Sequence, residues 1–369
     1  FFYISMNYLK SFMALSLILF QIFLPPFANS SVYNPQVAEM LSDANPHRWM
    51  GWIRALSGAD PIQTADGLEK IMTRSSLVMF EPDAKPSAFD YLIEELLRMG
   101  FVEGQDFQIH NYDFPYGDRY PQRNWKNIIL SFQGDDPKLE NEHVLFVAHM
   151  DSTSDNEYLI APGADDNASG TAGLLEAASI LQHYRFGRTI DLIWFSGEEK
   201  SRVGSTSFVE DYADWLPNII GVVNMDMFAF DGDGDACFEV HAGTLPGSQE
   251  IGNLIGSVIE AYDLGLTYDF LDDENAYPFS DHDPFWRKGV PGVLLMENSF
   301  YHPDETCGKS DRNYNYHRTS DTINYINSDT GFSILQAGIA TVAHLAQPLP
   351  SKLTESIDIS IPGKACQLD

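Results

Sequence analysis

The feature that most constrains the fold is an alternation of short apolar runs with longer segments of helical periodicity. Strands are predicted over residues 127–132, 143–148, 190–195, 219–225 and 292–296. Helices are predicted over residues 87–99, 171–184, 251–262 and 333–346, where apolar side chains recur on one face. Strands that alternate with helices indicate an α/β fold with a mostly parallel sheet, and the uninterrupted apolar runs indicate strands buried on both faces.

Chemically related polar residues follow these predicted strands. Such sheets bind ligands beyond the carboxyl ends of their strands, so residues just after each strand are the candidates for a site. They are His149-Met150-Asp151, Ser196-Gly197-Glu198-Glu199, Asp226 and Glu297, joined by Gly163-Ala164-Asp165-Asp166-Asn167 and by His317 from intervening loops. Isolated buried carboxylates are costly, so their repetition at one edge predicts a cation site.

Imidazole nitrogen and carboxylate oxygen are zinc ligands, and this set is too large for one tetrahedral ion. In two-metal hydrolases the ions lie roughly 3.5–4 Å apart, so one carboxylate bridges them while another remains free to accept a proton. The adjacent Glu198 and Glu199 suit this division, because neighbouring side chains diverge at a strand end. The spacing of His149 and Asp151 places both on one face of an extended segment, which predicts that Asp151 accepts from the second nitrogen of His149.

Several motifs carry a resemblance to the M28 family of zinc peptidases, on its aminopeptidase side. They are HMDS (149–152), PGADDNASG (162–170), SGEE (196–199), GS (204–205), NMDM (224–227), SDHDPF (280–285), GVPGVLLMEN (289–298) and YHRTSDT (316–322). They follow the family order over about residues 85–345. The resemblance implies a three-layer α/β/α sandwich around a mixed, mostly parallel sheet of about eight strands. We expect one zinc peptidase domain over residues 31–349, with a helical N-terminal part over about 31–85.

The resemblance also implies roles for individual residues. Two zinc ions per chain would be held by His149, Asp165, Glu199, Asp226 and His317, with Asp165 as the bridge. Glu198 takes the position of the general base, and Asp151 supports His149. Tyr277 matches a tyrosine that stabilises the oxyanion in some members, although two cysteines frame that tyrosine there and Asn275 and Phe279 flank it here.

For the neighbouring residues the sequence leaves more than one role open. Asp166 and Asn167 are expected to cap the following helix rather than to bind metal. For Glu297 a contact with the substrate amine, support of a ligand and a purely structural role remain alternatives. His282 is expected to be structural or to support the site, and His241 to lie in a loop.

The expected function is that of a secreted, monomeric di-zinc aminopeptidase that removes N-terminal residues from peptides. Glutaminyl cyclases, which share much of the scaffold but use one zinc, remain an alternative, as do carboxypeptidases and amino-acid deacylases. Some relatives have lost ligands and act only as binding modules. Here every ligand position and the position of the base are filled, which favours an enzyme.

The N-terminal segment of the chain and its excess of acidic residues indicate which compartment and which partners are expected. Residues 1–30 combine Lys10, an apolar run over 12–24, Pro25-Pro26 and small residues before Ser30, the pattern of a secretory signal peptide. The run is shorter than the roughly 20 residues of a membrane span. We therefore expect an extracellular or periplasmic protein. With 53 Asp and Glu against 22 Lys and Arg, neither nucleic acid nor stable membrane association is expected.

Two further features of the sequence, its cysteines and a run of aspartates and glycines, allow more than one interpretation. The three cysteines, Cys237, Cys307 and Cys366, allow one disulfide whose pairing the sequence does not decide, and residues 350–369 read as a C-terminal tail. The run Asp231-Gly232-Asp233-Gly234-Asp235 resembles the start of a calcium loop. Ala242 occupies the twelfth position, where such a loop carries glutamate, so a hairpin turn is favoured.

Overall fold

The computed structural model describes residues 32–81, 86–113, 124–299 and 306–350. The predicted signal peptide (1–30) and all but the first residue of the predicted tail (350–369) lie outside the described residues. Every helix and strand of the described chain falls within one compact unit that begins at Tyr33. None of the described helices is both long enough and apolar enough to cross a membrane.

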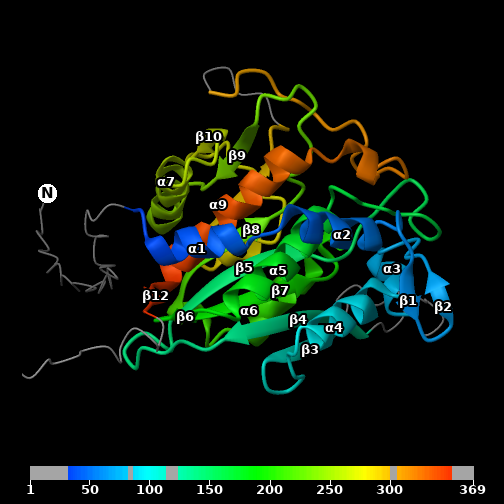
Figure 1. Cartoon of the computed structure of the whole chain (residues 1–369), viewed down its shortest axis with the longest axis horizontal. Coiled ribbons are helices and arrows are strands. Elements are labelled where there is room, and N and C mark those ends of the chain that lie inside the picture. The colour runs from blue at the N-terminus through cyan, green and yellow to red at the C-terminus, as the bar shows by residue number, and fades with distance from the viewer. Residues whose placement is uncertain (1–31, 82–85, 114–123, 300–305, 351–369) are drawn as a thin grey trace, which may run out of the picture. The chain divides into compact units, whose positions relative to one another are not determined.

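The centre of the molecule is a mixed sheet of eight strands (Figure 1). Their spatial order is β10 (Thr267–Leu271), β9 (Cys237–His241), β11 (Gly292–Glu297), β8 (Ile219–Met225), β5 (His143–His149), β7 (Thr189–Phe195), β4 (Asn124–Phe132) and β3 (Phe107–Asp113). The pairs β10/β9, β11/β8, β8/β5 and β5/β7 are parallel, whereas β9/β11, β7/β4 and β4/β3 are antiparallel. This confirms the predicted sheet, including all five strands predicted from the apolar runs.

Helices cover both faces of the sheet, because alternate side chains of the central strands point to opposite sides. Leu145 and Val147 of β5 pack in a buried cluster with Phe208, on the side of α6 (Val203–Asp211) and α8 (Asp283–Arg287). The intervening Phe146 lies against Gly338 of α9 (Ser328–Ala346). On that second face lie α9 and α5 (Ala168–Leu181), with α1 (Pro35–Asp43), α2 (Pro46–Leu56) and α7 (Pro246–Ala261) packed against them (Figure 1). The result is the predicted three-layer sandwich.

Smaller elements complete the described chain. They are the hairpin of β1 (Ile62–Thr64) and β2 (Gly67–Glu69), α3 (Ser76–Met79), α4 (Ala88–Arg98), the pair β6 (Arg185–Phe186) and β12 (Pro348–Leu349), and 3₁₀ turns at Glu198–Lys200, Leu216–Asn218 and Ile323–Tyr325. The segment before residue 85, predicted as helical and loop-like, thus also contains a hairpin. Its residues supply contacts to the site, described below.

The edge of the sheet that contains β9 differs most from the prediction. Strand β9 was not predicted, and His241 closes it as a buried residue rather than lying in a loop. The Asp231–Asp235 run is not a hairpin turn, since β11 separates β8 from β9. It is a connecting turn in which Asp231 accepts from the main-chain nitrogen of Gly234 at 2.7 Å.

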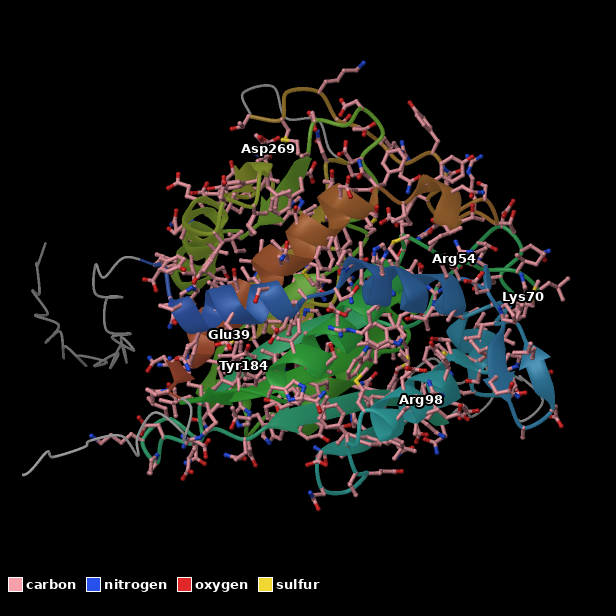
Figure 2. The ribbon with its side chains drawn as sticks, viewed as in Figure 1. Glu39, Arg54, Lys70, Arg98, Tyr184 and Asp269 are labelled. Carbon is pink, nitrogen blue, oxygen red and sulfur yellow. A yellow bond between two sulfur atoms is a disulfide. The ribbon has the colours of Figure 1, made fainter. Side chains whose placement is uncertain are left out.

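A disulfide joins Cys237, at the start of β9, to Cys307. The main-chain nitrogen of Cys307 also donates to Asp269 of β10 at 2.9 Å (Asp269 is labelled in Figure 2). The loop that continues towards His317 is therefore tied to the edge of the sheet. Of the pairings that the sequence left open, the structure shows this one.

Candidate metal centre

Two groups of side chains that could hold a metal ion meet at the carboxyl ends of the central strands. The first group is His149, Asp166 and Asp226, and the second is Asp166, Glu199 and His317. Within each group the ligand atoms lie within 4.8 Å of one another. His149 ends β5, Asp226 follows β8 and Glu199 follows β7, so three neighbouring parallel strands deliver their residues to one edge, as predicted.

Asp166 belongs to both groups through different oxygens. Its Oδ1 lies 3.3 Å from Nε2 of His149, and its Oδ2 lies 3.2 Å from Nε2 of His317. The remaining members complete each group, with Asp226 Oδ1 at 3.0 Å from His149 Nε2 and Glu199 Oε2 at 3.0 Å from His317 Nε2. A carboxylate that faces both ligand groups through different oxygens is placed where it could bridge two metal ions.

This arrangement corrects the expectation that Asp165 bridges. Asp165 points the other way, where its Oδ1 accepts from the nitrogen of Ala229 at 2.8 Å and its Oδ2 from Asn313 at 3.1 Å. The carboxylate of Asp321 accepts from the main-chain nitrogens of both Asp165 and Asp166, each at 3.1 Å, and so fixes the loop. These tertiary contacts hold the side chain of Asp165 away from the cavity and leave Asp166 facing it.

Two residues near Asp166, Asn167 and Glu297, have structural roles. Asn167 caps α5 by accepting from the nitrogen of Gly170 at 2.8 Å, as expected, whereas Asp166 does not cap the helix. Glu297 is buried beside Asp165, away from the cavity, and burial together with Asp165 raises its pKa well above the ordinary value. Of its three predicted roles, the structural one fits this position.

The electrostatics of the two groups fit a cation. Although burial lowers the pKa of His317, its contacts with Asp166 and Glu199 raise it to about 11. Burial and the neighbouring Asp166 raise the pKa of Glu199 to about 7, and its Oε1 is buried with no hydrogen-bond partner among the described residues. Positive charge is strongly stabilised between these side chains, and their nitrogen and oxygen donors are those that zinc binds.

Glu198 stands apart from both groups and lines the same cavity. Burial raises the pKa of its carboxyl group well above the ordinary value. Its main-chain nitrogen donates to Asp151 Oδ1 at 3.3 Å, and Ser76 donates to Asp151 Oδ2 at 2.9 Å. The Oγ atom of Ser76 in turn accepts from the nitrogen of Gly197 at 2.9 Å. Asp151 and Ser76 thus hold the turn that presents Glu198.

The predicted contact between His149 and Asp151 exists in a modified form. Nδ1 of His149 lies 3.1 Å from the main-chain carbonyl oxygen of Asp151 and 3.6 Å from its carboxylate. The carbonyl can only accept, so Nδ1 carries the proton and Nε2 is left to face Asp166 and Asp226. The carbonyl of Asp151 therefore selects the tautomer, while its carboxylate supports Glu198.

The ligand groups open into a cavity of about 300 Å³. Its walls are formed by Asp166, Glu198, Asp226, Met227, Tyr277, Phe279, Leu294, Met296, Ser299, Arg312, Asn313, Tyr316 and His317. Met227, Leu294 and Met296 form one apolar cluster on which Tyr277 and Tyr316 pack. Burial raises the pKa of Tyr277, so its phenol is a hydrogen-bond donor near neutral pH. The cavity combines charged ligands with an apolar wall.

Arg74 is a buried residue of the site region that the sequence did not reveal. Its guanidinium is fully buried and donates to main-chain carbonyls: to Met150 at 3.0 Å, Leu56 at 3.1 Å, Gly163 at 2.8 Å and Pro162. Burial lowers its pKa only to about 10, so it stays charged at neutral pH. One side chain thereby joins the end of α2 to Met150, which follows His149, and to the loop that carries Asp166.

We expect Arg74→Met to lower the free energy of unfolding by about 3–5 kcal/mol, because the buried carbonyls lose their donors. Arg54→Met is the matched control. Arg54, labelled in Figure 2, is 42% exposed and pairs with the half-exposed Asp60, so its loss is expected to cost less than about 1 kcal/mol. Urea unfolding followed by tryptophan fluorescence measures both. Equal losses in the two variants would contradict the role given to Arg74.

Comparison with known proteins defines the class. The model of peptidase family M28 matches residues 127–342, more than half of the chain, and the chain belongs to that family. A probable leucine aminopeptidase of Trichophyton verrucosum is 28% identical over 211 residues, which are 55% of this chain and 52% of that protein. The chain spans about half the length of the curated relatives it matches.

Solved structures share the fold. The Legionella pneumophila LapA aminopeptidase superposes with a TM-score of 0.65 at 20% identity, covering 94% of this chain and 81% of that one. A glutaminyl cyclase from an Acidobacteriales bacterium reaches 0.62 at 16% identity, covering 82% of this chain and 94% of that one. Because both kinds of enzyme have this fold, the fold alone does not choose between their reactions.

Proposed function

We propose that the protein is a secreted zinc-dependent aminopeptidase that removes N-terminal residues from peptides. The observation that carries this proposal is the sharing of Asp166 by two ligand groups while Glu198, free of both, faces the same cavity. His149 and Asp226 would hold one zinc ion, Glu199 and His317 the other, and Asp166 both. The relatives named leucine aminopeptidase support the proposal.

Zinc, when bound, would polarise the scissile carbonyl and lower the pKa of a water molecule to about 7. The carboxylate of Glu198 takes the proton of that water and passes it to the departing amine. The hydroxyl of Tyr277 donates to the carbonyl oxygen as negative charge develops there. The carboxylates around the cavity attract the protonated α-amine of a peptide, and the apolar wall of Met227, Leu294 and Met296 receives the side chain of the terminal residue.

Secretion is proposed from two features. Residues 1–30 have the pattern of a signal peptide. The disulfide between Cys237 and Cys307 belongs to a bond type that persists in oxidising compartments and is rare in the cytosol. Cell fractionation of the full-length chain, with N-terminal sequencing of the mature protein, would test this part independently of activity.

The activity is tested with aminoacyl-p-nitroanilides that carry different side chains. We expect hydrolysis to require a free amine, to stop when a chelator removes the metal, and to return with zinc. N-acetylated substrates serve as controls, and N-terminal glutaminyl peptides test for the cyclase reaction. Zinc-loaded protein that releases ammonia from glutaminyl peptides, but leaves every free-amine anilide intact, would replace the aminopeptidase with a cyclase.

A further inference from the structure

Two buried histidines contact the main chain of Tyr277, one at its nitrogen and one at its carbonyl oxygen. The nitrogen of Tyr277 donates to Nδ1 of His241 at 3.0 Å, and its carbonyl oxygen lies 2.9 Å from Nε2 of His282. Both imidazoles are fully buried. His241 ends β9, whereas His282 lies just before α8, so the two contacts come from separate parts of the fold.

These contacts fix the proton of each imidazole. An amide nitrogen can only donate, so Nδ1 of His241 is unprotonated, and Nε2 faces the buried Glu239 at 2.8 Å. A carbonyl oxygen can only accept, so Nε2 of His282 carries a proton. Burial and the neighbouring His241 lower the pKa of His282 to about 3, which keeps it neutral over the working range of an enzyme. The Nε2–H of His282 therefore remains available to the carbonyl oxygen of Tyr277 near neutral pH.

The residues after Tyr277 are tied to the rest of the site. Arg202 donates to the carbonyl of Pro278 at 2.6 Å, and its guanidinium lies 5.5 Å from the ring centre of Phe279. The main-chain nitrogen of Arg202 donates to the carbonyl of Glu198 at 2.7 Å. Ser280 donates to Asp226 at 2.6 Å. The segment from Tyr277 to Ser280 is thereby linked both to the turn of Glu198 and to a candidate ligand.

We propose that His241 and His282 are positioning residues that aim the phenol of Tyr277 into the cavity. The inference rests on the proposed function, in which that phenol stabilises the oxyanion. Cysteines do not flank Tyr277 at the positions expected from the resemblance, since Asn275 and Phe279 stand there. Here the two hydrogen bonds between buried imidazoles and the main chain of Tyr277, one at its N–H and one at its carbonyl oxygen, hold the loop in place. Neither histidine lines the cavity, so in this proposal each acts through the placement of Tyr277 rather than by contact with the substrate.

The test compares two replacements of His282. Leucine removes the donor, whereas glutamine keeps an N–H near the position of Nε2. We expect His282→Leu to lower kcat about 10-fold or more, with little change in KM, because misplacing a catalytic group by about 1 Å costs up to about 10²-fold. His282→Gln is expected to restore most of that loss. His344→Leu is the matched control, since His344 of α9 contacts Tyr262 at 2.9 Å and does not line the cavity.

A double-mutant cycle with Tyr277→Phe decides whether His282 acts through the phenol. Tyr277→Phe alone is expected to lower kcat by about 10²-fold. In that background His282→Leu should then cost less than about twofold, since nothing remains to be positioned. Fully additive losses, or a His282→Leu variant with the kcat of the wild type, would overturn the inference and leave the aminopeptidase assignment intact.

Hydrogen exchange provides a readout that needs no substrate. The amide hydrogen of Tyr277 is protected by His241, and a loosened loop should exchange it about 10-fold faster in His282→Leu but not in His344→Leu. Unchanged exchange in His282→Leu would refute the anchoring. If the wild-type protein hydrolyses no aminoacyl substrate, the proposed function and the catalytic half of this inference fail together, and exchange then tests the anchoring alone.

Discussion

Replacing Glu198 with glutamine is expected to lower kcat by about 10²–10⁴-fold, the usual contribution of a general base. The amide has nearly the same shape and accepts no proton. Because Glu198 belongs to neither ligand group, the variant should bind as much zinc as the wild type. Steady-state kinetics on aminoacyl-p-nitroanilides, combined with metal analysis by mass spectrometry, measures both quantities on the same sample.

A control variant tests whether the loss of turnover is specific to Glu198. Glu157→Gln changes another partly buried glutamate, which pairs with Lys200 at 2.7 Å and does not line the cavity. It is expected to keep kcat within a few-fold of the wild type. A Glu198→Gln variant with normal turnover would remove Glu198 from the reaction, and one that has lost its zinc would make Glu198 a ligand instead.

Asp166→Ala is expected to have the second large effect, the loss of tightly bound zinc from both groups. Asp166 supplies an oxygen to each group, so its removal leaves His149 with Asp226 and His317 with Glu199, each one donor short of the three protein ligands of catalytic zinc sites. Isothermal titration with zinc, after dialysis against chelator, should show a fall in affinity of several orders of magnitude. Activity should fall with it.

Asp165→Asn is the control, because it replaces one carboxylate oxygen of the adjacent aspartate with an amide nitrogen. Its side chain faces Ala229 and Asn313, so zinc binding should stay close to that of the wild type. The reverse outcome, in which Asp165→Asn loses zinc and Asp166→Ala retains it, would restore the assignment made from sequence resemblance. The pair of variants therefore tests the orientation of the loop directly.

The central half of the fold was predictable because its strands are unbroken apolar runs. Strands β5, β7 and β8 are buried along almost their whole length, and hydrophobicity alone marks them. Strand β9 escaped prediction because its five residues include Glu239 and His241, which read as a polar loop. Inside the protein Nε2 of His241 lies 2.8 Å from a carboxylate oxygen of Glu239, so each side chain has a hydrogen-bond partner. The sequence does not indicate this pairing.

The kinds of side chain at the site were predictable, whereas their orientation was not. Residues that follow strands of a parallel sheet meet at one edge, which is why His149, Asp226 and the pair Glu198-Glu199 could be named as candidates from their positions, whereas the resemblance to the family assigned Glu199 to the metal. The loop that carries Asp165 and Asp166 is held by Asp321, more than 150 positions away, and the side chain of Asp165 is held by Ala229 and Asn313. Ser76 carries no motif and lies far from the other site residues in sequence, so nothing marked its contact with Asp151.

The contacts of Arg74 also limit how this protein can be divided into smaller parts. The family model matches residues 127–342, yet the carbonyls of Met150, Pro162 and Gly163 find their donor at residue 74. Residues 127–342 on their own would carry the candidate ligands without the arginine that spaces their loops. The smallest transferable unit of this protein is therefore larger than its recognisable family segment.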